Sequence, residues 1–403
     1  MTDGHIFLML FLLLTLIGIC EGVWHRRNLS KIPIRIHVNG TRGKSSVVRL
    51  IAGGLREAGI VTCAKTTGTL ARMIMPDATE YAVFRPGGAN IIEQVRIISR
   101  AASLRAQAVV VECMALQPGL QWFCESVFMR STHGVITNAR ADHLDVMGPS
   151  EEDVAHALAG STPVQAKLFT AERKYLSVFK GAAEDRDTGL IETTAQDVTA
   201  ITDSEMEGFS YVEHRENVAL SLTVCADLGI ERQTALQGMW KAPPDPGVMT
   251  IAHIRFFGRT INFVNAFAAN DPESTEQLWN IALAKFPDVE KRIIILNLRS
   301  DRPNRSEQLG KILTKWKSAD HYLLIGTGTN FLARAAIAEG LPAKKLLFAE
   351  HESDSDIFET IIELSGASAL VVGMGNAKGQ GLSLVRFFHN RGSLKDTVHK
   401  GVS

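Results

Sequence analysis

The chain has 403 residues, of which 45% are hydrophobic, and its 43 Lys and Arg residues balance its 43 Asp and Glu residues. This length predicts two or three domains, and a net charge of zero gives no support for a nucleic-acid partner. The five cysteines are odd in number and have no Cys-x-x-Cys spacing. They therefore predict neither a disulfide framework nor a zinc site, and they fit a reducing compartment.

The first residues depart from this soluble composition. Residues 6–20 are almost wholly apolar, and with flanks from Gly4 to Trp24 the run approaches the roughly 20 residues that span a bilayer. Only Asp3 precedes it, without the positive charge of a secretory signal, and basic residues follow it. Residues 1–27 are therefore predicted to be a single-pass membrane anchor with the body of the protein in the cytoplasm. The alternative is a buried or interfacial helix.

A glycine-rich turn follows, between a strand-like run at 34–38 and a helix-like run that reaches Leu55. Glycines let backbone N–H groups turn toward a phosphate, a lysine adds a positive charge, and a serine hydroxyl completes a magnesium shell. The usual loop has a further glycine where this chain has Val38, so a shorter form of the ATP-binding loop is predicted. The alternative is a chance turn. The predicted nucleotide-binding residues are Gly40, Thr41, Arg42, Gly43, Lys44, Ser45 and Ser46.

Two further strand-like runs end in polar residues. The run 108–111 leads to Glu112, and the run 134–137 leads to Asn138 and then to Asp142, His143 and Asp145. In α/β enzymes, ligands lie at the carboxyl ends of parallel strands, so these residues are expected beside the phosphate loop. Taken alone, Asp142 can also be a helix cap, and His143 and Glu112 can be structural.

A proline-rich linker at 241–247 predicts a domain boundary, because proline lacks a donor and resists helix. Beyond it, buried strands are predicted at 293–296, 322–325 and 369–372, and two of them run into glycine turns. The alternation of strands and helices predicts an α/β fold with mostly parallel sheets. The predicted domains are an ATP-binding domain at 28–245 and a smaller, Rossmann-like substrate domain at 246–403.

These motifs, in this order, resemble the Mur ligase superfamily, and within it the ligase subunits of capsule-type poly-γ-glutamate synthases. The resemblance rests on the phosphate loop with Arg42, on residues 112–115, on residues 137–145 and on the segment 265–275. It also rests on architecture, because only about 40 residues precede Lys44 and leave no room for the uridine-nucleotide domain of the peptidoglycan ligases.

The resemblance implies an ATP-dependent amide ligase that activates a carboxylate as an acyl phosphate. It assigns Lys44, Glu112 and His143 to catalysis, and Ser45, Glu112 and His143 to Mg²⁺. Asn138 and Asn217 match nucleotide-contacting positions of the family, and a helix cap or an exposed asparagine is the alternative. Many relatives carry a carbamylated lysine, but here the nearby lysine, Lys167, lies further along than expected, and its use stays open.

The same resemblance suggests residues that contact the substrate, for each of which an ordinary polar turn or charged loop is the alternative. A guanidinium pair suits glutamate carboxylates, because each can bind a carboxylate through two hydrogen bonds. The candidates are Thr67, Thr69, Asn270, Asp271, Arg299 and Arg302.

The predicted function is therefore polymerisation of glutamate through γ-carboxyl linkages, with ATP and Mg²⁺. The expected partners are glutamate, the growing poly-γ-glutamate chain, the membrane and small integral-membrane subunits of a synthesis and export complex. Two alternatives stay open at this point. One is a folylpolyglutamate-like ligase, and the other is a membrane-tethered P-loop ATPase that powers or regulates assembly without forming a bond.

Overall fold

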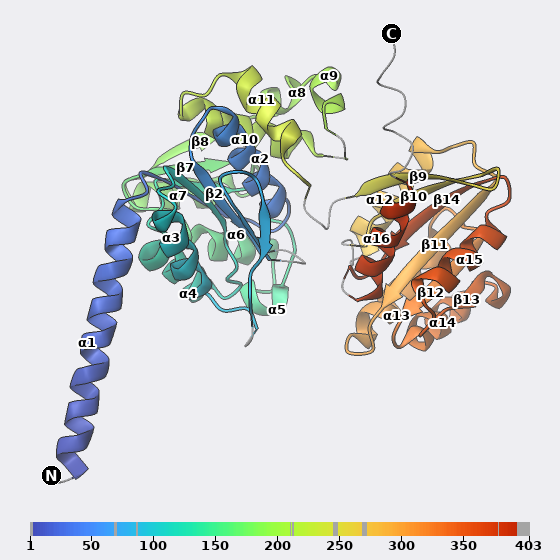
Figure 1. The fold of residues 1–403 in the computed structure, drawn as a ribbon, viewed down its shortest axis with the longest axis horizontal. Helices are drawn as coiled ribbons and strands as arrows, with labels where there is room; N and C mark the ends of the chain where they lie inside the picture. Colours follow the sequence, from blue (N-terminus) through green and yellow to red (C-terminus); the bar gives the residue numbers. More distant parts are fainter. Residues whose placement is uncertain are drawn as a thin grey trace. The chain divides into compact units, whose positions relative to one another are not determined.

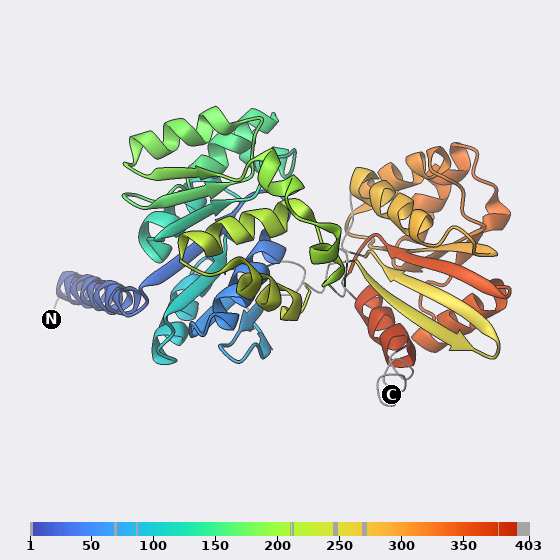
Figure 2. The same cartoon turned by 90° about the horizontal axis from the view of Figure 1, so that it is seen from above.

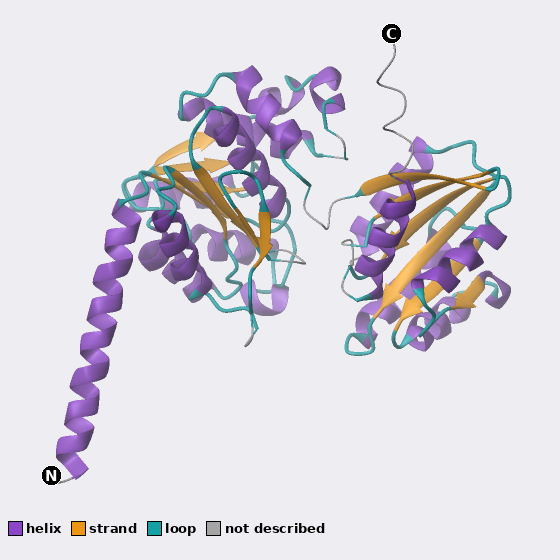
Figure 3. Ribbon diagram, viewed as in Figure 1, coloured by secondary structure: helices purple, strands orange, loops and turns teal. Residues whose placement is uncertain are grey.

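The computed structural model of the chain describes residues 3–67, 71–85, 88–209, 211, 213–244, 249–267, 272–377 and 379–392. The chain divides into two compact units, Met1–Asp245 and Pro246–Ser403. The division falls inside the proline-rich stretch 241–247. In each unit helices cover both faces of a β-sheet, as the colours of Figure 3 show. Each unit is therefore described by itself.

The first unit begins with a long helix, α1 (Asp3–Ser30). Its side chains are exposed from Gly4 to Trp24, and this part of the helix stands away from the unit (Figure 1). It is long and apolar enough to cross a membrane, and no other helix in the described ranges passes the same test. The last turn differs, because Leu29 is buried and packs with Ile32 into the core of the unit.

The first sheet has eight strands within the described residues. Their bounds are β1 (Ile34–Asn39), β2 (Thr62–Thr66), β3 (Arg72–Ile74), β4 (Glu80–Ala82), β5 (Ala108–Glu112), β6 (His133–Ile136), β7 (Lys167–Thr170) and β8 (Gly189–Glu192). The order is β4-β3-β2-β5-β1-β6-β7-β8, with antiparallel pairing only where β3 and β4 extend one edge. β1 lies between β5 and β6 and is parallel to both. The ends of these three strands therefore meet at one edge.

Helices cover both faces of this sheet because its central strands are apolar on both sides. Val110 packs into the cluster that includes α2, α10 and α11, whereas Val109 and Val111 pack on the opposite face with α3. The helices of this unit after α1 are α2 (Lys44–Glu57), α3 (Glu93–Ser103), α4 (Pro118–Phe123), the π-helix η1 (Cys124–Met129), α5 (Leu144–Met147), α6 (Glu151–Ala159), α7 (Leu176–Asp185), α8 (Ala195–Thr199), α9 (Asp203–Glu207), α10 (Arg215–Asp227) and α11 (Arg232–Lys241).

The second unit contains a six-stranded sheet in the order β13-β12-β11-β14-β10-β9, counted over the described ranges. Its strands are β9 (Thr250–Phe256), β10 (Arg259–Asn265), β11 (Lys291–Leu298), β12 (His321–Gly326), β13 (Leu346–Phe348) and β14 (Ser368–Met374). β9 pairs antiparallel with β10, and the other pairs are parallel. The sequence did not predict this β9–β10 hairpin, whose polar and apolar residues give weaker buried runs than β11 or β14.

Helices cover this sheet on both faces as well. Figure 2 shows the golden α12 and the dark red α16 on opposite sides of it. Phe388 of α16 stacks on Phe263 of β10 at 4.0 Å between ring centroids, and Trp279 of α12 is fully buried. The helices of the unit are α12 (Pro272–Lys285), α13 (Pro303–Ile312), α14 (Thr329–Ala338), α15 (Asp354–Leu364) and α16 (Gln380–Gly392), with the 3₁₀ turns η2 (Leu313–Lys315) and η3 (Ala343–Lys345).

Candidate functional site

The glycine-rich loop joins the carboxyl end of β1 to the first turn of α2. Gly40 and Gly43 have φ angles of 131° and 81°, in the region that favours glycine. A Cβ at Gly40 would lie 2.1 Å from Oγ1 of Thr137, and a Cβ at Gly43 would lie 2.6 Å from Oδ1 of Asn217. Both glycines are thus required by conformation and by space. No side chain caps the start of α2, so the first N–H groups of the helix are suited to an anion.

Lys44 folds back over this loop. Its Nζ donates to the carbonyl oxygens of Gly40 and Thr41 at 2.6 and 3.1 Å. The ammonium group is therefore held within the curve of the loop, where a phosphate bound by the loop would contact it. An ammonium in this position neutralises charge without needing the planar geometry of an arginine.

Glu112 lies next to the loop at the end of β5. It is only 3% exposed, and one of its carboxylate oxygens, Oε2, accepts from Oγ of Ser45 at 2.8 Å and from the backbone N–H of Thr67 at 2.6 Å. A serine hydroxyl and a carboxylate oxygen are ligands that Mg²⁺ prefers. The two side chains therefore fit one metal-binding position beside the loop.

Asn138 supports the loop from the other side, after β6. Its Oδ1 accepts from Oγ1 of Thr41 at 2.6 Å and from the N–H of Arg42 at 3.1 Å, and its Nδ2 donates to the carbonyl of Arg42 at 3.1 Å. Oγ1 of Thr137 donates to the same carbonyl at 2.6 Å. In this structure Asn138 therefore fixes the shape of the phosphate loop.

Asn217 reaches the loop from α10. Its Nδ2 donates to Glu213 at 2.9 Å, and burial raises the pKa of Glu213 despite its hydrogen bonds with Asn217, the His214 backbone and Ser46. Sequence reasoning missed Glu213. Its signal was its position, four residues before Asn217 and just ahead of α10, but a single glutamate outside any motif carried no weight.

A second residue that was missed is Lys65 in β2. Its side chain is fully buried and forms an ion pair with Glu93 at 3.4 Å, and Arg85 contacts the same carboxylate at 2.6 Å. Burial lowers the pKa of Lys65, against the attraction of Glu93 and Glu112. A lysine in the middle of a buried strand was the available signal. The positive charge of Lys65 attracts the carboxylates of Glu93 and Glu112.

His143 lies on the segment that follows β6, at the same edge of the sheet as the loop. It has φ 48°, precedes α5, and its side chain is 41% exposed. Its Nε2 lies 3.8 Å from Asp142, which is 4.0 Å from Nη2 of Arg42. The alternative that Asp142 caps the next helix does not hold, because the residue at the cap position is His143. Among the described residues, no three His, Cys, Asp or Glu side chains are grouped closely enough to hold a metal.

Lys167 lies far along the strand direction from the loop. It is the first residue of β7, at the amino edge of the sheet, and its Nζ forms an ion pair with Asp227 at 2.6 Å. Since the phosphate loop is at the carboxyl edge, Lys167 does not lie near the predicted metal residues.

The predicted substrate residues lie in different settings, and one of them lines a cavity. Arg299 lines a cavity of ≈ 640 Å³ at the carboxyl ends of β11 and β12, together with Thr327 and Gln380. Its guanidinium is paired with Asp301 at 2.5 Å, and Arg302, just before α13, is exposed. Thr67 donates its backbone N–H to Glu112. The remaining candidates lie outside the described residues; these are Thr69, Asn270 and Asp271.

Comparison with known proteins adds the family. The Mur ligase middle domain matches residues 38–224, and the poly-gamma-glutamate synthase CapB C-terminal domain matches residues 251–391. The chain is 36% identical over 375 residues to PGA synthase CapB of Bacillus subtilis (strain 168), which covers 93% of this chain and 94% of that protein. The chain belongs to the CapB family. It is also 37% identical to the capsule biosynthesis protein CapB of Bacillus anthracis, over 92% of this chain and 82% of that one.

Solved structures show the fold of this CapB-family chain. Folylpolyglutamate synthase from Thermotoga maritima has a TM-score of 0.64 at 15% identity and covers 90% of this chain and 92% of its own. E. coli FolC in complex with DHPP and ADP has a TM-score of 0.64 at 14% identity, with coverages of 92% and 93%. The predicted Mur-ligase-like α/β fold and the predicted membership among poly-γ-glutamate ligases are confirmed.

Proposed function

We propose that this chain is an ATP-dependent ligase that extends poly-γ-glutamate, and that its reacting phosphate lies in the loop between β1 and α2. The observation that carries this proposal lies at one edge of the first sheet. There Lys44 folds back over the loop, and the neighbouring Ser45 donates a hydrogen bond to Glu112. Membership of the CapB family supports the choice of glutamate as the substrate, since the two relatives named above are a PGA synthase and a capsule biosynthesis protein.

The reaction has two steps. In the first, an oxygen of the γ-carboxylate attacks the γ-phosphorus of ATP, the bond to the β–γ bridging oxygen breaks, and ADP leaves. In the second, the amine of the next glutamate attacks the acyl carbon, phosphate leaves and the amine loses a proton. Both steps bring anions together, so a site for them must neutralise charge where it develops.

The residues take parts that follow from their contacts. The first-turn N–H groups of α2 and the Lys44 ammonium bind the phosphates, while Asn138 keeps the loop in shape and Asn217 approaches it from α10. Ser45 and Glu112 would hold Mg²⁺, with His143 as a further ligand, and the metal would supply positive charge to the transferred phosphoryl group. Arg299 and Arg302 would bind glutamate carboxylates in the second unit.

The location follows from α1. We propose that α1 crosses the bacterial cell membrane once and that the basic residues after it keep both units in the cytoplasm. A growing polyanion released in solution would diffuse away, whereas one made at the membrane can be passed on. The proposal therefore includes small integral-membrane subunits that export the chain.

The test is reconstitution of the full chain in membranes with labelled glutamate and ATP. A polymerase releases ADP only when glutamate is present and forms γ-amide bonds in equal number. Release of ADP without amide would indicate a membrane-tethered ATPase and would contradict the proposal. Faster glutamate addition to a folate acceptor than to oligo-γ-glutamate would favour the folylpolyglutamate-like alternative, whose fold the chain shares.

A further inference from the structure

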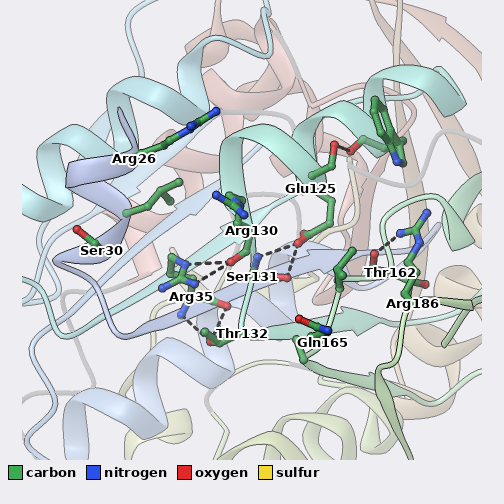
Figure 4. Close-up of a pocket in the computed structure, with 15 residues that line it drawn as sticks. Arg26, Ser30, Arg35, Glu125, Arg130, Ser131, Thr132, Thr162, Gln165 and Arg186 are labelled. Carbon is green, nitrogen blue, oxygen red and sulfur yellow. Dashed lines mark hydrogen bonds between the residues drawn. The ribbon is translucent and has the colours of Figure 1, made fainter. Parts of the chain in front are cut away.

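A second cavity, of ≈ 580 Å³, lies at the opposite, amino edge of the first sheet. It is formed where α1 joins the unit, by the last turns of α1, the start of β1, the π-helix η1 and the segments before β6 and β7 (Figure 4). Its lining residues are Arg26, Leu29, Ser30, Arg35, Trp122, Glu125, Ser126, Arg130, Ser131, Thr132, Thr162, Val164, Gln165, Ala166 and Arg186. None of them belongs to the site proposed above.

The cavity is strongly basic. Four arginines line it, and the one carboxylate among its described lining residues, Glu125, is already engaged. The N–H and the hydroxyl of Ser131 donate to Oε1 of Glu125 at 2.7 and 2.8 Å, and Nδ1 of the buried His37 lies 2.7 Å from Oε2. Burial alone would lower the pKa of His37, but Cys113 and Glu125 outweigh it and raise the pKa to about 10. Even with the Glu125 carboxylate counted, the four arginines leave the cavity a net positive charge.

Two of these arginines are held rigidly. Nε and Nη2 of Arg35 donate to the carbonyl of Arg130 at 3.0 and 2.9 Å, and its Nη1 donates to Ile32 at 2.8 Å. Nη1 of Arg186 donates to the carbonyls of Gly160, at 3.1 Å, and Thr162. Figure 4 shows Arg35 beside Arg130, with Arg186 on the other side of the cavity. Since a guanidinium has five donors, Arg35 can keep these bonds and still bind an anion.

The position of the cavity along α1 indicates how far it lies from the hydrocarbon layer of a membrane that α1 would cross. The exposed stretch from Gly4 to Trp24, in which Glu21 is the one Asp, Glu, Lys or Arg, rises by about 30 Å at about 1.5 Å per residue, which matches the hydrocarbon thickness of a bilayer. Because α1 continues unbroken to Ser30, Arg26 lies about 3 Å beyond Trp24 and Ser30 about 9 Å beyond it. With α1 across a membrane, the cavity opens in the layer of lipid head groups.

The rim of the cavity is apolar on one side. Trp122 and Val164 line it and are 50% and 64% exposed, and Phe123 and Val127 are exposed on the same α4–η1 segment. This segment contacts the C-terminal part of α1, where Nε2 of His25 lies 3.0 Å from the carbonyl oxygen of Phe128. Exposed tryptophan is typical of surfaces at the membrane–water boundary.

We propose that this cavity binds the phosphate head group of an anionic phospholipid, with the α4–η1 rim against its glycerol and upper acyl carbons. The bound lipid would hold the first unit in one orientation on the membrane, with the phosphate loop at the opposite edge of the sheet. The inference rests on α1 crossing the membrane and not on the ligase chemistry. Basic cavities at the cytoplasmic end of a membrane span are established head-group sites in other proteins.

The test uses the full chain in detergent micelles with phosphatidylglycerol or phosphatidylcholine, and native mass spectrometry to count the lipids retained. The test variant is Arg26→Gln with Arg130→Gln, whose side chains are exposed. The matched control is Arg27→Gln with Arg105→Gln, because Arg27 is next on α1 and Arg105, like Arg130, has a positive φ, but neither lines the cavity. We expect one retained phosphatidylglycerol, weakened about 25-fold by the test pair, at about fivefold per charge, and less than about twofold by the control.

The proposal is wrong if phosphatidylcholine is retained equally, or if the control pair weakens binding as much as the test pair. It is also wrong if millimolar inorganic phosphate displaces the lipid, which would indicate a site for a free phosphate compound, or if oligo-γ-glutamate does so, which would indicate a polymer site. Extraction of the chain from vesicles by alkaline carbonate would show that α1 does not span, and would overturn the inference. Glutamate-dependent ADP release, measured on the same samples, reports separately on the ligase proposal.

Discussion

The two edges of the first sheet are both suited to anions but are built in different ways. At the carboxyl edge, the anion site is made by backbone groups of one short loop, with Lys44 and Glu112 beside it. At the amino edge, it is made by arginine side chains from α1 and β1 and from the residues that directly follow η1 and α7. The carboxyl edge therefore appears in the sequence as a contiguous motif, whereas the amino edge appears only once the chain is folded.

The comparison also separates two kinds of task. A reacting phosphate needs groups fixed within fractions of an ångström, which glycine turns and a helix N-terminus provide. A head group that only holds the protein on a surface needs charge at the right depth, and arginines on several elements provide that. Each of the following changes tests one edge while leaving the other as its internal control.

The largest effect is expected at the carboxyl edge, from Lys44→Ala. The change removes a charge that acts mainly in the transition state, so glutamate-dependent ADP release should fall on the order of a hundredfold or more, about 3 kcal/mol. Lipid retention should not change. Lys180→Ala, which breaks only an exposed ion pair with Glu192, is the control. Wild-type turnover of Lys44→Ala in a steady-state assay would remove this loop from the mechanism.

The next effect concerns the metal residues. Glu112→Gln keeps the hydrogen bonds with Ser45 and Thr67 but removes the charge, and His143→Asn suits the positive φ of that position. Each change should raise the Mg²⁺ concentration needed for half-maximal rate, and Glu112→Gln should slow the saturated reaction by on the order of fiftyfold. If the two act as a unit, the double variant should cost little more than the worse single one.

Additive losses in the double variant would mean that His143 and Glu112 do not serve one metal site. An unchanged Mg²⁺ dependence in His143→Asn alone would remove His143 from the set. This outcome would agree with its exposed side chain and leave Ser45 and Glu112 as the proposed ligands.

Some strands and site residues of this chain could be predicted from its sequence, and others could not. The strands β1, β5, β6, β11, β12 and β14 were predicted to within a few residues, because each is a short apolar run buried on both faces. The phosphate loop could be proposed from the sequence because it is a contiguous motif, and Glu112 because it ends an apolar strand-like run. Lys65 and Glu213 could not be proposed in this way. Lys65 matters through an ion pair with the distant Glu93, and Glu213 matters through its burial. The basic cavity depends on α1 meeting β6 and β7, which no local pattern encodes.

A smaller effect is expected at the amino edge, on stability. Glu125→Gln removes the partner of His37, and loss of a charged hydrogen bond should cost about 2 kcal/mol. The pKa of His37 is raised to about 10 in the folded chain, above the unfolded value of about 6.5. The contribution is therefore complete below about pH 6.5 and is lost as the pH rises through about 10. Thermal unfolding in micelles should show a difference between wild type and Glu125→Gln that shrinks from pH 6.5 to pH 10.

Glu192→Gln is the control for general effects of alkaline pH, because its ion pair with Lys180 is exposed. If the difference between wild type and Glu125→Gln is the same at both pH values, His37 is not the cation that balances Glu125. The head-group proposal does not depend on this outcome, because the four arginines that line the cavity outnumber its one carboxylate.

The smallest effect is expected from Lys167→Gln, which decides whether the carbamylated lysine of many Mur ligases has a counterpart here. Lys167 begins β7 at the amino edge, where it pairs with Asp227 while 47% exposed. An exposed pair of this kind contributes about 0–1 kcal/mol, so ADP release should stay within about twofold of wild type and should not respond to added bicarbonate. A loss of tenfold or more that short carboxylic acids restore would instead place a carbamylated Lys167 in the reaction. It would also require β7 to deliver its first residue to the carboxyl edge, which parallel pairing of β6 with β7 does not allow.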